Sequence, residues 1–117
     1  MPCLQGRNLC TSNSMKKYGL HGKLQATTGN GPALAQLLLE ASKMVSTAKG
    51  CRLYLISQED TAPDDVWVTE VWDSKEDHDN SLQAPGVKEL IAQAMPLLAG
   101  RPDKGQQLTV LGGAGLN

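Results

Sequence analysis

Residues 51–72, CRLYLISQEDTAPDDVWVTEVW, contain two apolar stretches that flank a polar turn. The first stretch runs from Cys51 to Gln58 and the second from Val66 to Trp72. The segment between them is polar and includes Pro63. Two strand-like stretches joined by so short a connection are typical of a hairpin. The sequence therefore predicts two adjacent antiparallel strands here.

One strand and one helix are expected before this hairpin. Between residues 16 and 26, apolar and polar side chains alternate, which is the period of a half-buried strand. A turn follows in which Asn30 or Gly31 can cap a helix and Pro32 suits the first helical position. The helix is expected to end at Lys49 and Gly50. Its apolar stripe consists of Leu34, Leu37, Leu38, Ala41, Met44, Val45 and Ala48.

A second helical region and a last strand are expected after the hairpin. Ser74 can cap this helix, with Asp77 three residues further on. Pro85 interrupts the helix, because proline cannot continue the hydrogen-bond ladder. The helical pattern then resumes and ends at Gly100, and residues 106–111 form the last strand.

The resulting order β-α-β-β-α-β predicts an α+β domain of the ferredoxin-like kind. In this arrangement one antiparallel sheet carries both helices on the same face. Residues 15–112 are expected to form this single domain. Residues 1–14 show neither period and are expected to be a disordered or variable N-terminal tail, and residues 113–117 a flexible C-terminal tail.

The composition excludes several classes of function. The 117 residues are 40% hydrophobic and 20% charged with a net charge of −1, unlike a nucleic-acid binder with its many cations. No apolar run approaches the roughly 18 residues of a membrane span, and residues 1–14 lack the pattern of a secretory signal. We therefore expect a cytoplasmic protein with no nucleic-acid or membrane partner.

The cysteines and histidines do not form a recognisable metal or disulfide pattern. Cys3, Cys10 and Cys51 are odd in number and make no C-x-x-C pair. With His21 and His78 as the two histidines, a metal site would need carboxylates at unremarkable spacings. We expect no metal, and a buried thiol at Cys51.

Both faces of the predicted sheet look partly apolar. Leu53 and Leu55 alternate with Tyr54 and Ile56, so apolar side chains point to both sides. Helices can cover one face, which predicts a homodimer in which a second copy packs sheet to sheet. A monomer with scattered exposed apolar residues is the alternative.

Residues 69–77, TEVWDSKED, resemble the E-x-W motif and acidic helix start of the antibiotic biosynthesis monooxygenase (ABM) domain family. Residues 50–54, GCRLY, are similar to the family's Gly-Cys opening of the second strand. Residues 95–100, MPLLAG, add a further likeness near the end. The pattern matches from Lys16 to Leu111 in the same element order.

This resemblance implies a dimeric α/β barrel and an oxidation reaction. Characterised relatives include quinol monooxygenases and enzymes that oxidise polycyclic phenols with molecular oxygen, using no metal or flavin. We therefore expect a cofactor-independent monooxygenase that acts on a quinol or polyphenolic small molecule, with this aromatic substrate and molecular oxygen as its partners. A non-catalytic small-molecule binding or interaction module on the same dimeric fold is the alternative, and a haem-degrading monooxygenase is a third reading.

Two candidates for the catalytic base are His21 and Glu70. His21 lies mid-strand, and an imidazole suits the removal of a phenolic proton at neutral pH. Glu70 shares a strand face with Trp72, where a buried carboxylate must pair or take a proton. The structural alternatives are a half-exposed histidine at the dimer face and a salt bridge from Glu70 to Arg52 or a lysine.

The substrate-binding candidates are Trp72, Tyr54, His78 and Ser81. Trp72 ends a strand where its ring can wall a cavity, or simply fill the core. Many family members carry a histidine about nine residues after the motif tryptophan, where this chain has Ser81 and, one turn earlier, His78. A solvent-exposed His78 is the alternative, and Tyr54 and Trp67 can instead anchor the dimer. With four aromatic residues in the chain, aliphatic walls favour a compact ring over haem.

Overall fold

The computed structural model describes residues 16–100 and 105–116, so the predicted tail at 1–14 lies outside it. The strands are β1 (Lys17–Gln25), β2 (Cys51–Glu59), β3 (Ala62–Trp72) and β4 (Gln106–Val110). The helices are α1 (Gly31–Val45), α2 (Lys75–Ser81), α3 (Pro85–Ala94) and the 3-10 turn η2 (Met95–Leu97). Residues 111–116 have no regular structure, and the flexibility of 113–117 stays a prediction.

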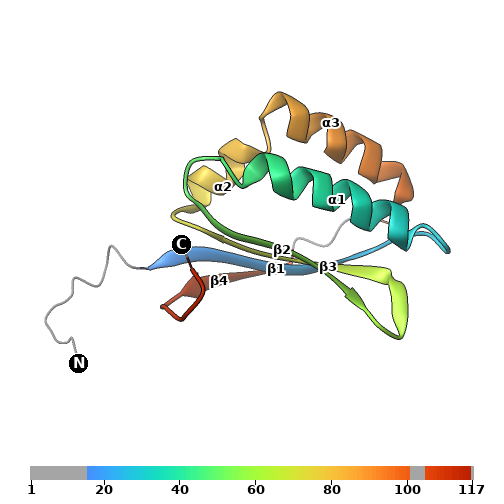
Figure 1. Cartoon of the computed structure of the whole chain (residues 1–117), viewed down its shortest axis with the longest axis horizontal. Helices are drawn as coiled ribbons and strands as arrows, with labels where there is room; N and C mark the ends of the chain where they lie inside the picture. The colour runs from blue at the N-terminus through green and yellow to red at the C-terminus, as the bar shows by residue number, and fades with distance from the viewer. Residues whose placement is uncertain (1–15, 101–104, 117) are drawn as a thin grey trace, which may run out of the picture.

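The strands form one antiparallel sheet in the order β2-β3-β1-β4. The helices α1, α2 and α3 lie on one face of this sheet, and the other face is open (Figure 1). This confirms the predicted α+β, ferredoxin-like arrangement. The register places Tyr18 opposite Trp72 and His21 opposite Thr69, which fixes which side chains share a face.

The predicted hairpin is present, but its second strand begins earlier than expected, at Ala62. Glu59 pairs with Ala62 across an irregularity in the register, and Gln58 pairs with Val66. Pro63 lies in this irregular part, where the ladder does not require the N–H that proline lacks. The side-chain amide of Gln58 donates to the Pro63 carbonyl at 2.7 Å and closes the end of the hairpin.

The second helical region is divided at Pro85, as predicted. Ala84 is extended, with φ −62° and ψ 135°, because the ring of the following proline disfavours a helical conformation. The hydroxyl of Ser74 accepts the backbone N–H of Asp77 at 3.1 Å, which confirms the predicted cap of α2. This cap fixes where α2 begins and therefore where His78 lies.

The start of α1 is capped by a different residue than the local sequence indicates. Asn30 is the first flanking residue, but its side chain donates to Thr27 and not to the helix. The amide groups of Gly29 and Gly31 instead donate to the carboxylate of Asp64 on β3, at 3.0 and 2.8 Å. A carboxylate at a helix N-terminus also interacts favourably with the helix dipole.

The end of α1 also differs, because the helix stops at Val45 and not near Gly50. The hydroxyls of Ser46 and Thr47 donate to the carbonyls of Lys43 and Met44 and so satisfy acceptors of the last turn. Gly50 then turns the chain into β2 with φ +83°, a conformation that favours glycine.

The core consists of two clusters beneath the helices. Ala26, Leu34, Val66 and Ala94 form one cluster, and Val45, Trp72 and Val87 form the other. No helix within residues 16–100 and 105–116 is long and apolar enough to cross a membrane.

Replacement of Asp64 by alanine will lower the free energy of unfolding by about 1–2 kcal/mol, because two amides at the start of α1 lose their acceptor. Urea denaturation measures this change. The matched control is Asp65→Ala, which removes a carboxylate that contacts Lys23 at 3.7 Å and caps no helix. Equal losses in the two variants would show that Asp64 does not cap α1.

Candidate functional site

A cavity of about 170 Å³ lies between the sheet and the helices. Its wall is almost entirely aliphatic, with polar side chains from Glu70, Tyr54 and Ser81. A second hollow of about 130 Å³ adjoins it and shares Leu24, Leu38, Tyr54 and Glu70 with it. The remaining cavity wall comes from Leu37, Ala41, Val45, Leu82, Val87, Leu90, Ile91, Ala94, Met95 and Leu98.

Glu70 supplies the cavity's carboxylate from near the end of β3. The residue is 8% exposed, and burial raises the pKa of its carboxyl above the ordinary value. The indole Nε1–H of Trp72 donates to Glu70 Oε1 at 2.9 Å, and this bond together with nearby His78 partly offsets the rise in pKa. No donor among residues 16–100 and 105–116 is hydrogen-bonded to Glu70 Oε2, and Glu70 lines the cavity.

Trp72 lies behind Glu70 and does not line the cavity. Residues two apart on a strand share a face, so β3 places both side chains toward the helices. The Trp72 ring is fully buried against Val45 and Val87. Its contribution in this structure is the hydrogen bond that holds Glu70 Oε1, and direct contact with a substrate stays a prediction.

His78 also lies behind Glu70, on α2. Its Nε2 is 3.7 Å from Glu70 Oε1, and its Nδ1 is 2.8 Å from Asp79 Oδ1. The ring packs 5.5 Å from Tyr18 and edge-on to Trp72 at 5.9 Å. The structure thus buries His78, and it does not show the solvent-exposed histidine that the sequence left open.

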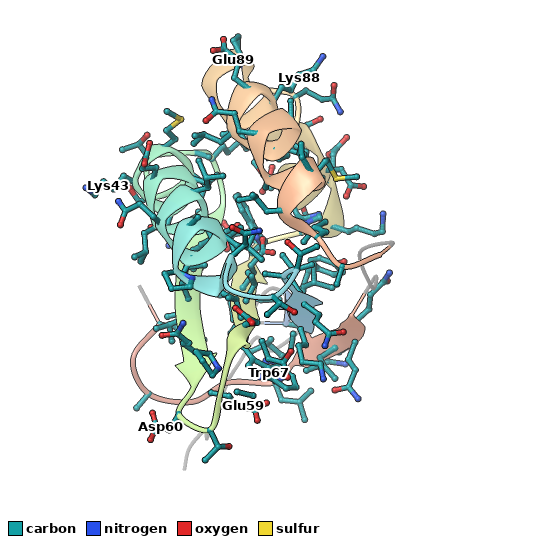
Figure 2. The ribbon with its side chains drawn as sticks, turned by 90° about the vertical axis from the view of Figure 1, so that its right-hand side faces the viewer. Lys43, Glu59, Asp60, Trp67, Lys88 and Glu89 are labelled. Atoms are coloured by element: carbon teal, nitrogen blue, oxygen red, sulfur yellow. The ribbon has the colours of Figure 1, made fainter. Side chains whose placement is uncertain are left out.

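Ser81 and Tyr54 both line the cavity, and their contact with a substrate stays a prediction. The hydroxyl of Ser81 donates to the carbonyl of His78 at 2.6 Å and closes the last turn of α2. Burial raises the pKa of Tyr54, so its phenol keeps its proton and can donate a hydrogen bond. Tyr54 therefore faces the helices, whereas Trp67 lies on the open side of the sheet beside Glu59 (Figure 2).

His21 is not brought together with Glu70. It pairs in register with Thr69, so its side chain lies on the open face of the sheet. Its Nδ1 is 2.9 Å from Thr69 Oγ1, and its ring stacks on Trp67 at 5.1 Å. The two candidate bases are therefore separated by the sheet, and Glu70 is the one that lines the cavity.

Arg52 forms an ion pair with Asp73, where the sequence had allowed one with Glu70. Its guanidinium donates to both carboxylate oxygens of Asp73, at 2.8 and 2.9 Å. Lys17 also donates to Asp73 at 3.1 Å. These contacts lower the pKa of Asp73 to about 2. Arg52 and Lys17 are therefore paired with Asp73. The polar neighbours of Glu70 are instead the indole of Trp72 and the imidazole of His78.

Two residues that contact His78 were not identified from the sequence as site residues. Tyr18 packs on His78, and its position opposite Trp72 depends on the register of β1 and β3. Asp79 contacts Nδ1 of His78. The sequence indicated this contact only through the position of Asp79 next to a histidine in an acidic helix start. Across residues 16–100 and 105–116 no group of three or more His, Cys, Asp and Glu side chains is placed to hold a metal ion.

Replacement of Glu70 by glutamine will stabilise the fold at neutral pH. Glutamine keeps an acceptor for Trp72, while the cost of a buried charge disappears. Because the folded-state pKa of Glu70 is raised, the wild type loses stability as the pH rises from the ordinary value of glutamate to that raised value. The Glu70→Gln variant will lack this loss, as urea denaturation at several pH values will show.

The matched change is Trp72→Phe, which removes the donor and leaves the carboxylate unsatisfied. We expect it to cost about 1–3 kcal/mol at neutral pH and less at acidic pH, where Glu70 is protonated. A cost that is independent of pH, or equally large in the Glu70→Gln background, would contradict the assigned role of the hydrogen bond.

The family model described as "Antibiotic biosynthesis monooxygenase" matches residues 18–93. No curated protein matches the chain. Among solved structures, a candidate antibiotic biosynthesis monooxygenase from Chloroflexus aurantiacus J-10-fl is 40% identical with a TM-score of 0.78. The match covers 86% of this chain and 99% of that chain.

Two further structures are more distant. A candidate antibiotic biosynthesis monooxygenase from Deinococcus radiodurans is 27% identical, with a TM-score of 0.65 over 86% of this chain and 96% of that one. A protein from Mycobacterium tuberculosis is 21% identical, with a TM-score of 0.72 over 84% and 98%, and shows the likeness of fold alone. On the family match and the similarity to the Chloroflexus protein, this chain belongs to the antibiotic biosynthesis monooxygenase family.

Proposed function

We propose that this chain is a monooxygenase that oxidises a single-ring phenol or quinol with molecular oxygen. Family membership supports a monooxygenase-like function in general. The observation that carries the finer proposal is a buried carboxylate, Glu70, in the wall of an apolar cavity. A base in an apolar site can take a phenolic proton while the walls exclude water.

The size of the cavity favours one ring. An apolar cavity of roughly 150 Å³ binds benzene in a well-studied case. The cavity here is about 170 Å³, and the adjoining hollow of about 130 Å³ gives room for ring substituents. A haem macrocycle is much larger, so the haem-degrading alternative has no support from this volume. A non-catalytic binding module would not need an ionisable group in the cavity.

The proposed reaction balances without an external electron donor. Glu70 Oε2 accepts the phenolic proton, and the phenolate supplies electrons to molecular oxygen as a carbon–oxygen bond forms at the ring. The oxygen–oxygen bond of this peroxide then breaks, the ring carbon loses its C–H proton, and a carbonyl forms. One oxygen atom stays in the quinone, and the other leaves as water with the two protons. All electrons come from the substrate.

The other face of the sheet supports a homodimer as part of this proposal. Leu55 on β2 and Leu108 on β4 are 48% and 50% exposed on the open face, beside Leu53 and Val71. A second copy packed there would bury this apolar surface and enclose His21 and Trp67. The proposed interface lies on the side of the sheet away from the helices (Figure 1).

Oxygen uptake with hydroquinones and single-ring phenols tests the activity. The Glu70→Gln variant will lose roughly 100-fold or more in kcat/KM, because the base is absent while the cavity keeps its shape. Wild-type kcat/KM will rise with pH through a pKa above that of an ordinary glutamate. The control is Glu89→Gln, an exposed change on α3, which will leave uptake unchanged.

The proposal is wrong if the wild type consumes no oxygen with any electron-rich phenol, or if Glu70→Gln retains full activity. Haem binding would appear as a shift of the Soret band during titration. Uptake that depends on a larger, multi-ring phenol and not on single rings would contradict the substrate size argued above.

The proposed dimer is tested by sedimentation equilibrium. The wild type will have twice the chain mass at micromolar concentration, and the Leu55→Asp and Leu108→Asp variants will be monomeric because a charge is placed in the apolar interface. Leu39→Asp on α1, at a similarly exposed leucine of the helix layer, will remain dimeric. A wild-type mass equal to one chain would exclude the dimer.

A further inference from the structure

The carboxyl of Glu70 is connected to the outside of the molecule by a line of two side chains. His78 Nε2 lies 3.7 Å from Glu70 Oε1, and His78 Nδ1 lies 2.8 Å from Asp79 Oδ1. One imidazole thus has a carboxylate at each of its nitrogens. The exposed fraction of the side chains rises along the line from 10% to 11% to 49%.

The line joins two separate hollows. Glu70 lines the inner cavity between the sheet and the helices. His78 and Asp79 instead line an outer hollow of about 280 Å³ together with Tyr18, Leu20, Lys75 and Gln107. The imidazole therefore lies between the inner cavity and the outer hollow, next to the carboxyl of Glu70.

The neighbours of His78 define its protonation pattern. Asp79 is an acceptor when ionised, so it selects the imidazole tautomer with its proton on Nδ1. The lone pair of Nε2 then points to Glu70. An ionised Glu70 offers no proton to that lone pair, which agrees with a separation longer than a hydrogen bond. A protonated Glu70 can donate a proton across this gap once that proton is on Oε1, the oxygen nearer to His78, and such contacts commonly tighten during catalysis.

We infer that His78 is a proton-relay residue that carries a proton between Glu70 and Asp79. A proton passes from Glu70 to His78 Nε2 as the Nδ1 proton passes to Asp79, so the imidazole ends neutral in its other tautomer. A flip of the ring or the reverse transfer then restores the first tautomer. The titratable and charged groups that face His78 are Glu70 from β3, Tyr18 from β1, and Asp79 and Lys75 from α2.

The inference rests on the proposed oxygenation, which sets two protons in motion. The phenolic O–H and the ring C–H each release one, and both end in the product water. Glu70 holds one proton at a time, so the first must move elsewhere before Glu70 can accept the second. The aliphatic walls offer no basic group, and the Tyr54 phenol keeps its own proton. His78 is the neighbouring base through which the first proton can pass to Asp79 and return.

Time-resolved infrared spectroscopy after a pH jump tests the relay without any substrate. The band of the protonated Glu70 carboxyl is assigned by its loss in Glu70→Gln. We expect His78→Ala to slow the relaxation of this band by about tenfold or more, and added imidazole to restore it. Asp79→Asn, at an exposed site that leaves the core intact, will also slow it. Glu76→Gln on the same helix is the control and will relax like the wild type.

Relaxation at the wild-type rate in both His78→Ala and Asp79→Asn would overturn the relay. Slowing in His78→Ala that imidazole fails to restore, with Asp79→Asn unaffected, would also overturn it, because it would indicate a structural effect alone. If His78→Ala does not fold, Asp79→Asn decides. Since this measurement uses no oxygen or phenol, failure of the relay and failure of the proposed oxygenation give different results.

Discussion

A single hydrogen bond, from the indole of Trp72 to the carboxylate of Glu70, makes the buried site possible. A carboxylate beneath a helix layer is costly unless a donor satisfies it. The E-x-W spacing places donor and acceptor on the same face of one strand, so β3 builds the pair locally. Trp72 occupies the core and binds Oε1, and Glu70 itself lines the cavity.

The rest of the fold surrounds this pair. The helices α1 and α3 supply most of the aliphatic wall above the sheet. The cap at the start of α2 fixes the position of His78, whose Nε2 lies near Glu70 Oε1. Tyr54 is the aromatic residue in the cavity wall. The scarcity of aromatic residues in the chain thus agrees with the proposal that one small ring binds here through contacts with leucine and valine.

Strand alternation predicted that Glu70 and Trp72 share a face, and the order of elements predicted the ferredoxin-like sheet. Alternation does not show how deeply a side chain is buried, so it did not show that Trp72 lies in the core and not in the cavity wall. It also does not relate the faces of two different strands. His21 lies opposite Thr69, and that register depends on long-range pairing. The cap of α1 by Asp64 is equally non-local, whereas Ser74 caps its own helix and was predicted.

The central claim is that Glu70 is a buried base whose carboxyl meets a phenol in the cavity. Its side-chain carboxyl carbon can be followed by ¹³C NMR across a pH titration, with and without a single-ring phenol such as 4-nitrophenol, and assigned with Glu70→Gln. We expect Glu70 to titrate above an ordinary glutamate and its resonance to shift saturably with the phenol. An ordinary titration that the phenol does not change would contradict the account.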